Sequence, residues 1–230
     1  MIQANNVTLR LGKRALFEDV NIKFTEGNCY GLIGANGAGK STLLKMITGL
    51  LRPDSGQIIF QGHPWSRKDL KDIGGLIETP PVYENLSAWE NLKVRALILG
   101  ETEARMREVL EIADLTDTGK KPAGKFSLGM KQRLGIAIAL LGHPKLLVLD
   151  EPVNGLDPLG TQELRHLIRS FPDQGITVLV SSHILSEIQQ TADYIGIIAN
   201  GKLGYEGIVD ESQDLEQLFM KIVAVERGVR

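Results

Sequence analysis

Cysteine, net charge and long apolar runs are all scarce in this sequence. The 230 residues include one cysteine, Cys29, so no disulfide can form within the chain, and a reducing compartment fits this usage. Cys29 stands in an apolar run with no cation or base beside it, so we expect a small buried strand residue and not a reactive thiol. The formal net charge of −2 disfavours a main function of holding nucleic acid, which usually needs a basic face, and no nucleic acid partner is expected.

The lack of long apolar runs bears on any role at a membrane. The longest candidate, residues 134–141, is followed by Gly-His-Pro and falls short of the ~20 residues that a membrane-spanning helix needs. The first residues, Met-Ile-Gln-Ala-Asn-Asn, lack the basic and apolar regions of a signal peptide. If the protein acts at a membrane, we expect another chain to supply the spanning part.

What the chain does contain is an alternation of strand and helix patterns. Strands are predicted over residues 2–9, 16–25, 29–33, 57–61, 73–77, 146–149 and 176–181, and helices over 41–50, 87–140, 159–170 and 214–225. Apolar strands that alternate with helices indicate an α/β fold with a buried, mainly parallel sheet. The length predicts one domain over residues 1–230, in which a helical lobe (79–142) is inserted between the sheet-forming parts (1–78 and 143–230).

A glycine-rich segment directly follows the predicted strand 29–33 and opens a helix. Its sequence over residues 34–41, Gly-Ala-Asn-Gly-Ala-Gly-Lys-Ser, fits the phosphate-loop pattern at every fixed position. Glycines let the backbone curl so that N–H groups point at phosphate oxygens, Lys40 supplies a positive charge, and the Ser41 hydroxyl is placed to bind Mg²⁺. An ordinary glycine-rich turn is the alternative, and the matched context disfavours it. The predicted nucleotide-binding residues are Gly34, Asn36, Gly37, Gly39, Lys40, Ser41 and Thr42.

Two acids follow four aliphatic residues at the end of the predicted strand 146–149. Ligands of open α/β sheets bind at the carboxyl ends of the strands, so Asp150 is predicted to hold Mg²⁺, directly or through water. Because strand residues alternate faces, Glu151 points elsewhere and is predicted to polarise an attacking water. A strand that simply ends in solvated acids is the alternative, which the phosphate loop makes unattractive.

A second anion site is predicted within the helical lobe. Ser127 is expected to cap a helix that begins near Leu128, and Gly129 exposes N–H groups in its first turn. A plain capped amphipathic helix is the alternative at this position. By itself the segment would not decide between the two.

These motifs together resemble the ATP-binding cassette (ABC) ATPases, the motor subunits of ABC transporters, over nearly the whole chain. The segment 126–133, Phe-Ser-Leu-Gly-Met-Lys-Gln-Arg, keeps the serine and second glycine of the family signature Leu-Ser-Gly-Gly-Gln and changes its other three positions. The implied fold is that of a P-loop NTPase, with a mainly parallel central sheet, an antiparallel N-terminal β subdomain and the inserted helical lobe. In the family, the signature of one subunit covers the γ-phosphate bound to the other, so Ser127 and Gly129 are expected to contact ATP of a partner subunit.

Two further segments match the family. Residues 154–157, Asn-Gly-Leu-Asp, resemble the loop that crosses the dimer interface, which assigns Asp157 to that interface. The same residues also read as a turn before a helix, with Asp157 as N-cap and Pro158 at the first position, and both readings can hold. His183 matches the switch histidine of the family, implying contact with the γ-phosphate and a role in catalysis, although a lone loop histidine is more often a surface residue.

Two positions depart from the family. Glu78 stands where a glutamine near Mg²⁺ is usual, and an acid there implies a stronger metal ligand and an altered coupling of metal binding to lobe movement. Leu11 stands where an aromatic residue often stacks on adenine, so base discrimination is weaker and some use of GTP is possible; stacking of this kind contributes about 1 kcal/mol. Glu78 and the Phe-Ser-Leu-Gly-Met run resemble the bacitracin-resistance and lantibiotic-immunity exporters.

The resemblance implies an ATPase that dimerises with itself or a homologous subunit around two Mg-ATP. It would drive a separate transmembrane permease from the cytoplasmic, inner face of the cell membrane, and would export a peptide antibiotic or related amphiphile. A soluble single-cassette ATPase of assembly or repair, with no membrane partner, is the alternative. A P-loop switch or kinase is disfavoured by the segments around Ser127, Asp157 and His183.

Overall fold

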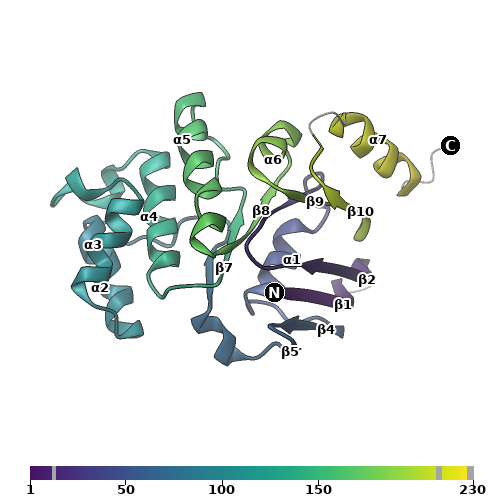
Figure 1. Ribbon diagram of the computed structural model, residues 1–230, viewed down its shortest axis with the longest axis horizontal. Coiled ribbons are helices and arrows are strands. Elements are labelled where there is room, and N and C mark those ends of the chain that lie inside the picture. Colours follow the sequence, from purple (N-terminus) through teal and green to yellow (C-terminus); the bar gives the residue numbers. More distant parts are fainter. Residues whose placement is uncertain (12–13, 211–213, 227–230) are drawn as a thin grey trace.

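The computed structural model describes residues 1–11, 14–210 and 214–226, and it contains two sheets with helices around them (Figure 1). The first sheet has the strand order β2-β1-β4-β5 and is antiparallel throughout. Its strands are β1 (Ile2–Leu11), β2 (Arg14–Phe24), β4 (Ser55–Phe60) and β5 (His63–Pro64). In β2, Val20, Ile22 and Phe24 are buried and the residues between them are exposed, which is the period of two of a half-buried strand.

The second sheet has the order β10-β9-β3-β8-β7-β6 and is parallel except for β10. Its strands are β3 (Cys29–Ile33), β6 (Ile73–Leu76), β7 (Leu146–Asp150), β8 (Thr177–Ser182), β9 (Tyr194–Ala199) and β10 (Lys202–Ile208). Every residue of β3, β7 and β8 is buried, because helices or the first sheet cover both faces. The predicted α/β fold with an antiparallel N-terminal sheet is confirmed, whereas β9 and β10 were not predicted.

Helices lie around this sheet and form the inserted lobe (Figure 1). The sheet is flanked by α1 (Lys40–Ile47), α5 (Pro158–Arg169), α6 (Leu185–Thr191) and α7 (Leu215–Glu226). The lobe contains α2 (Ala88–Leu99), α3 (Glu103–Ile112) and α4 (Leu128–Leu140), all within the 79–142 segment expected to form it. Short 3₁₀ turns occupy Arg67–Lys71, Thr116–Thr118, Ala123–Lys125 and Pro172–Gln174. No helix in these described ranges is long and apolar enough to cross a membrane.

The two faces of the parallel sheet belong to two apolar clusters. Alternate strand residues such as Leu147 and Leu149 join a cluster that includes the lobe, whereas Leu146 and Val148 join one that includes α1 and the antiparallel sheet. Cys29 lies in the first cluster and is fully buried. Burial, aided by the nearby Asp193 carboxylate, raises the pKa of the Cys29 thiol to about 12, so the thiol stays protonated near neutral pH. The expected buried strand cysteine is confirmed.

The turn between β9 and β10 packs tightly on the antiparallel sheet. Gly201 has a left-handed backbone (φ 76°), and its carbonyl accepts a hydrogen bond of 3.2 Å from the Glu18 N–H. A Cβ atom at Gly201 would lie 2.1 Å from the carbonyl oxygen of Leu16. Gly27 has a similar φ of 72° but open space around its missing Cβ. Substitution of Gly27 would therefore introduce backbone strain alone, whereas substitution of Gly201 would introduce backbone strain and a steric conflict.

We predict that Gly201→Ala destabilises the protein more than Gly27→Ala does. The Gly27 change should cost about 1–2 kcal/mol, because an L-residue is forced into the left-handed region. The Gly201 change should cost a further ~1–3 kcal/mol, because backbone atoms of β2 must move. Urea unfolding of the two variants measures the difference, and equal losses would show that the turn does not press on β2.

Candidate active site

The phosphate loop lies at the carboxyl edge of the parallel sheet, between β3 and α1. Gly37 and Gly39 have φ values of 79° and 108°, which side chains disfavour. A Cβ at Gly39 would lie 2.5 Å from the Phe17 ring, and one at Gly34 would lie 2.7 Å from the Ile198 carbonyl oxygen. Only glycine therefore fits at both positions. The phosphate-loop pattern thus places glycines at two positions where the structure leaves no room for a side chain.

The N-terminus of α1 offers unused donors to the loop. The first intrahelical bond recorded there runs from the Leu43 N–H to the Gly39 carbonyl, over 3.0 Å. The N–H groups of Lys40, Ser41 and Thr42 therefore have no acceptor within the helix, as is general for a first helical turn. Such a cradle of N–H groups at the positive end of the helix dipole fits phosphate oxygens.

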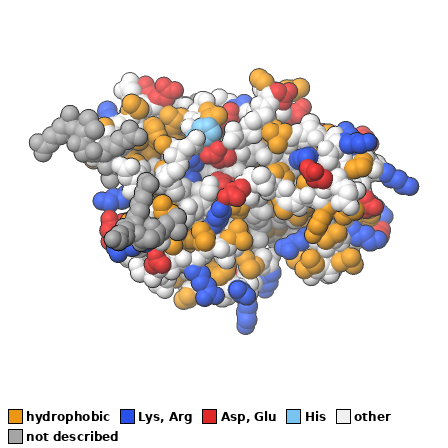
Figure 2. Space-filling view, turned by 180° about the vertical axis from the view of Figure 1, so that it is seen from behind, with side chains coloured by type: hydrophobic (Ala, Val, Ile, Leu, Met, Phe, Trp, Pro, Cys, Tyr) orange, Lys and Arg blue, Asp and Glu red, His pale blue; other side chains and the backbone are white. Residues whose placement is uncertain are grey.

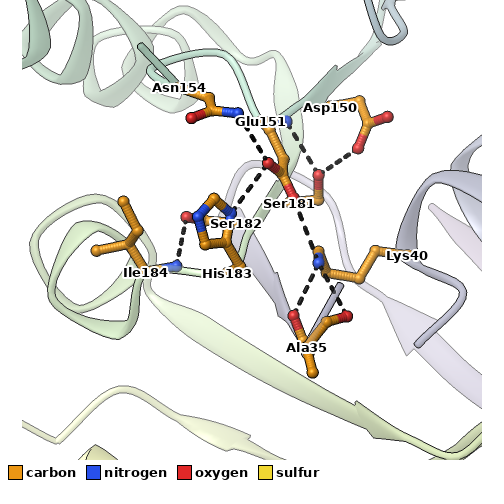
Figure 3. Close-up of polar contacts among 10 residues, drawn as sticks. Ala35, Lys40, Asp150, Glu151, Asn154, Ser181, Ser182, His183 and Ile184 are labelled. Atoms are coloured by element: carbon orange, nitrogen blue, oxygen red, sulfur yellow. Dashed lines mark hydrogen bonds and ion pairs between the residues drawn. The ribbon is translucent and has the colours of Figure 1, made fainter. Parts of the chain in front are cut away.

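The Lys40 side chain is folded back into the loop and is 4% exposed. Its ammonium donates to the Gly34 carbonyl (2.7 Å) and the Ala35 carbonyl (3.5 Å), and it lies 3.3 Å from Oε1 of Glu151 (Figure 3). A buried charge needs such partners, since its lost hydration must be replaced. The phosphate loop and the end of β7 are thus joined through one ammonium group.

Glu151 turns away from β7 because its backbone is left-handed, with φ 47°. Its Oε2 lies 3.0 Å from His183 Nδ1 and accepts from the Asn154 amide over 3.3 Å (Figure 3). An ionised carboxylate only accepts hydrogen bonds, so the His183 Nδ1–H is the donor in this contact. The structure therefore brings the two predicted catalytic residues together, and it adds Asn154, which the sequence assigned only to the interface loop.

Ser181, in β8, fixes the two acids at the end of β7. Its hydroxyl donates to Asp150 Oδ1 over 2.6 Å and accepts from the Glu151 N–H over 3.0 Å. Ser181 is fully buried, and Asp150 is also buried. Parallel pairing places Asp150 directly beside Ser181, which explains the contact. Ser181 was not predicted to be a site residue, because a serine near the end of an apolar strand belongs to no motif.

The signature segment lies apart from the phosphate loop. Ser127 caps α4, its hydroxyl accepting from the Met130 N–H over 3.2 Å, as predicted. Gly129 is half-buried, and a Cβ atom there would be in ordinary van der Waals contact with a Leu156 methyl at 3.7 Å. Among the contacts recorded for the described residues, none joins Ser127 or Gly129 to residues 34–42. One chain therefore carries two helix N-termini suited to anions, and no recorded contact joins them.

Asp157 caps α5, as its local sequence predicted. Its carboxylate accepts from the Gly160 N–H over 3.1 Å, and Pro158 occupies the first helical turn. This contact explains the Asp-Pro pair without reference to a second chain. The interface role of Asp157 stays a prediction.

The residues predicted to bind Mg²⁺ are only partly assembled. The described ranges hold no group of three or more His, Cys, Asp or Glu side chains able to ligate a metal. The Ser41 hydroxyl and one carboxylate at Asp150 nevertheless fit Mg²⁺, which usually keeps waters and binds through one or two carboxylates plus substrate phosphates. Glu78 lies instead against Lys45, with 2.5 Å between Oε1 and Nζ. The side chain of Leu11 lies outside the described residues, although its backbone ends β1.

The fold and this site define a P-loop nucleoside triphosphatase. A family model described as "ABC transporter" matches residues 17–154. The chain belongs to the ATP-binding cassette family, and it is the ATP-binding, ATP-hydrolysing subunit of an ABC transporter.

Similar proteins include two that are named for lantibiotic and bacitracin transport. The chain is 50% identical over 227 residues to the lantibiotic transport ATP-binding protein SrtF of Streptococcus pyogenes, covering 99% of each chain. It is 48% identical over 208 residues to the bacitracin transport ATP-binding protein BcrA of Bacillus licheniformis, covering 88% of this chain and 68% of that protein. Both likenesses extend across the phosphate loop and the acids that follow β7.

Solved structures agree with the fold. A structure of an ATP-binding subunit of an ABC transporter superposes with a TM-score of 0.85 at 30% identity, covering 96% of this chain and 99% of that one. The ADP conformation of the cassette MJ1267 gives a TM-score of 0.87 at 25% identity, covering 99% and 98%. A dimeric structure of the bacterial cassette MJ0796 gives 0.81 at 25% identity, covering 91% and 99%.

We predict that Ser181→Ala destabilises the folded chain by about 1–3 kcal/mol, because the buried Asp150 carboxylate loses its hydroxyl donor. The Glu151 N–H keeps its bond of 3.2 Å to the main-chain carbonyl of residue 181. Ser182→Ala is the matched control, since Ser182 is also buried but, in the contacts recorded for the described part of the chain, its hydroxyl accepts from the Ile184 N–H and binds neither acid. Chemical unfolding of both variants gives the comparison. Equal and small losses would show that Ser181 does not hold the acids in place.

Proposed function

We propose that this ATPase works as a dimer that encloses two Mg-ATP between its subunits. The observation that carries the proposal is the separation of two half-sites on one chain. The Lys40–Glu151–His183 cluster lies at the sheet edge, and the Ser127 helix end lies in the lobe, where Ser127 is exposed. A second copy, or a homologous subunit, would bring its Ser127 helix to the nucleotide bound by the first. The dimeric structure of MJ0796 supports this arrangement.

In each half-site the loop residues and Lys40 hold the triphosphate. Phosphate oxygens compete for the Lys40 ammonium with the Gly34 carbonyl and with the Glu151 carboxylate, both within 3.3 Å in the structure. The proposed metal ligands are Ser41, Asp150 and Glu78, and Mg²⁺ bound there would neutralise charge on the β- and γ-phosphate oxygens. Closure by the partner's N–H groups would surround the transferred group with fixed donors, the main source of catalysis in such sites.

Glu151 is the proposed base that orients or deprotonates the attacking water. Its carboxylate is oriented by His183 and Asn154, so it retains two partners when phosphate draws Lys40 away. His183 has a nitrogen to spare for the γ-phosphate, because Nδ1 alone faces Glu151. Loss of the γ-phosphate after hydrolysis would remove the bridge between the subunits and let them part.

A groove beside the lobe is the proposed docking site for a membrane permease. It encloses about 290 Å³ and is lined by residues of the 67–76 region, the 81–83 loop, α2 and α4. Tyr83 and Ile98 lie on it and are 55% and 71% exposed. Figure 2 shows hydrophobic side chains gathered at the lobe end of the molecule with Lys and Arg side chains around them. The segment 78–90, which leads from the sheet to the lobe, would then pass movement to the permease.

The transported substrate is proposed from the relatives. SrtF and BcrA are named for lantibiotic and bacitracin transport, which supports export of a peptide antibiotic or related amphiphile. The protein would act on the cytoplasmic, inner face of the cell membrane. Leu11 stands where an aromatic residue usually stacks on adenine. The proposal therefore includes some use of GTP in addition to ATP.

We predict that Glu151→Gln keeps ATP binding but lowers turnover by ~100-fold or more, the contribution of a positioned general base. Because hydrolysis is blocked, a nucleotide-bound dimer should accumulate. Phosphate release measures turnover, and light scattering with Mg-ATP measures the dimer. Glu163→Gln on α5, an exposed carboxylate paired with Arg133, is the control and should behave as wild type. Normal turnover in Glu151→Gln would remove Glu151 from the catalytic role.

The permease proposal predicts a separable defect at the groove. Ile98→Glu places a charge on its apolar wall and should abolish copurification with a multi-span membrane protein encoded beside this gene. ATP hydrolysis by the isolated protein should stay unchanged, since Ile98 lies outside the nucleotide site. Val225→Glu on α7, equally exposed but not on the groove, is the control. Retained copurification of Ile98→Glu would place the docking surface elsewhere.

A further inference from the structure

An ion pair between Lys45 and Glu78 connects α1 to the start of the lobe connection. Lys45 Nζ lies 2.5 Å from Glu78 Oε1, and the two side chains are 29% and 62% exposed. The residues are far apart in sequence, and neither makes another ion pair among those recorded for the described residues. Lys45 has no role in the catalytic cycle proposed above.

Lys45 lies on the same face of α1 as a proposed metal ligand. Ser41 and Lys45 are four residues apart, so they are neighbours along the helix surface. The rise of an α-helix puts their Cα atoms about 6 Å apart along its axis. A side chain bound to Lys45 is therefore held roughly one turn from the Ser41 hydroxyl.

Glu78 leaves the sheet at the same edge as Asp150. Strands β6 and β7 are parallel, with Leu76 paired to Leu149, so Glu78 follows one strand end just as Asp150 completes the other. Its backbone is left-handed, with φ 63°, where the chain turns out of the sheet toward the lobe. Glu78 therefore lies near the proposed metal ligands by topology, while its carboxylate is bound to a cation.

We propose that Lys45 is a positioning residue that competes with Mg²⁺ for Glu78. Lys45 holds the carboxylate about one helical turn from Ser41, and Mg²⁺ bound at the proposed site would draw the carboxylate away from Lys45. Lys45 therefore sets the metal affinity and the position of the first residues of the lobe connection. The inference rests on the proposed metal site of Ser41, Asp150 and Glu78.

The chemistry makes this competition specific to glutamate. A carboxylate attracts both an ammonium group and a divalent cation, and the positive charge of one weakens its attraction for the other. A neutral amide at position 78 would bind Lys45 weakly, and little would have to be broken before metal binding. Lys45 thus binds the Glu78 carboxylate until Mg²⁺ competes for it.

The test is a double-mutant cycle on the full-length chain, read without turnover. Saturating ADP is held constant, Mg²⁺ is titrated, and the Mg²⁺ concentration giving half of the maximal rise in Tm is measured. Lys45→Gln should lower this concentration by about two- to fivefold, the range that an exposed ion pair allows. Glu78→Gln should raise it, because an anionic ligand is lost. Lys45→Gln in the Glu78→Gln background should change nothing.

Two further variants serve as controls. Lys45→Arg keeps the ion pair and should retain the wild-type value. Lys145→Gln removes a cation that faces Asp72 at the opposite end of β6 and β7, and it should have no effect on Mg²⁺. The Tm of each variant without Mg²⁺ shows that it is folded.

The proposal is overturned by any of three results. Lys45→Gln that leaves the Mg²⁺ requirement unchanged removes the competition. An equal shift in the presence and absence of Glu78 shows simple repulsion between Lys45 and Mg²⁺. No effect of Glu78→Gln shows that Glu78 is not a ligand. Because the assay uses ADP and needs no dimer, these failures are distinct from a failure of the sandwich-dimer proposal, which would appear as a strictly monomeric Glu151→Gln variant with Mg-ATP.

Discussion

The site is organised around one buried ammonium group, that of Lys40. A charge at this depth is tolerated only with close partners, and Lys40 finds them in the Gly34 carbonyl and the Glu151 carboxylate. These partners come from two segments far apart in sequence, which meet because β3 and β7 end at the same edge of a parallel sheet. Holding Glu151 in this place needs the left-handed backbone, and the contacts with His183 and Asn154 follow from it. The proposed phosphate site and the proposed water-activating site are consequently connected by one ion pair.

Much of the fold could be predicted from the periodic pattern of apolar residues. The strands around the site are short runs of aliphatic residues, and each predicted strand matched an observed one to within a few residues. Strand β9 was missed although Tyr194–Ala199 is a similar apolar run. Strand β10 carries glycines at positions 204 and 207, which weaken a strand pattern, and α6 has only seven residues, too few to establish a helical period. The long helical pattern over 87–140 proved to be three helices joined by turns.

Site residues that belong to a local sequence motif were predicted. Residues whose role depends on contacts between distant parts of the chain were missed. Lys40, Asp150 and Glu151 stand in such motifs, and His183 was identified through the family resemblance. Ser181 and the Lys45 partner of Glu78 have no motif, since a serine and a lysine are common residue types whose meaning comes from neighbours 31 and 33 positions away. Alternation of strand faces predicted different directions for Asp150 and Glu151, but Glu151 lies beyond the last residue of β7. Its direction is set by its positive φ, which sequence pattern does not reveal.

The Phe17 ring lies where a side chain at Gly39 would otherwise be, so strand β2 shapes the inner curve of the phosphate loop. The loop and the antiparallel sheet are therefore thermodynamically linked: whatever binds the loop in this conformation also stabilises the packing of Phe17 beneath it, and by the same amount the packing favours binding. The N-terminal strands, which contribute no predicted phosphate ligand, thereby act as part of the nucleotide-binding apparatus. A substitution in the part of β2 that contacts the loop would therefore alter ligand affinity as well as folding.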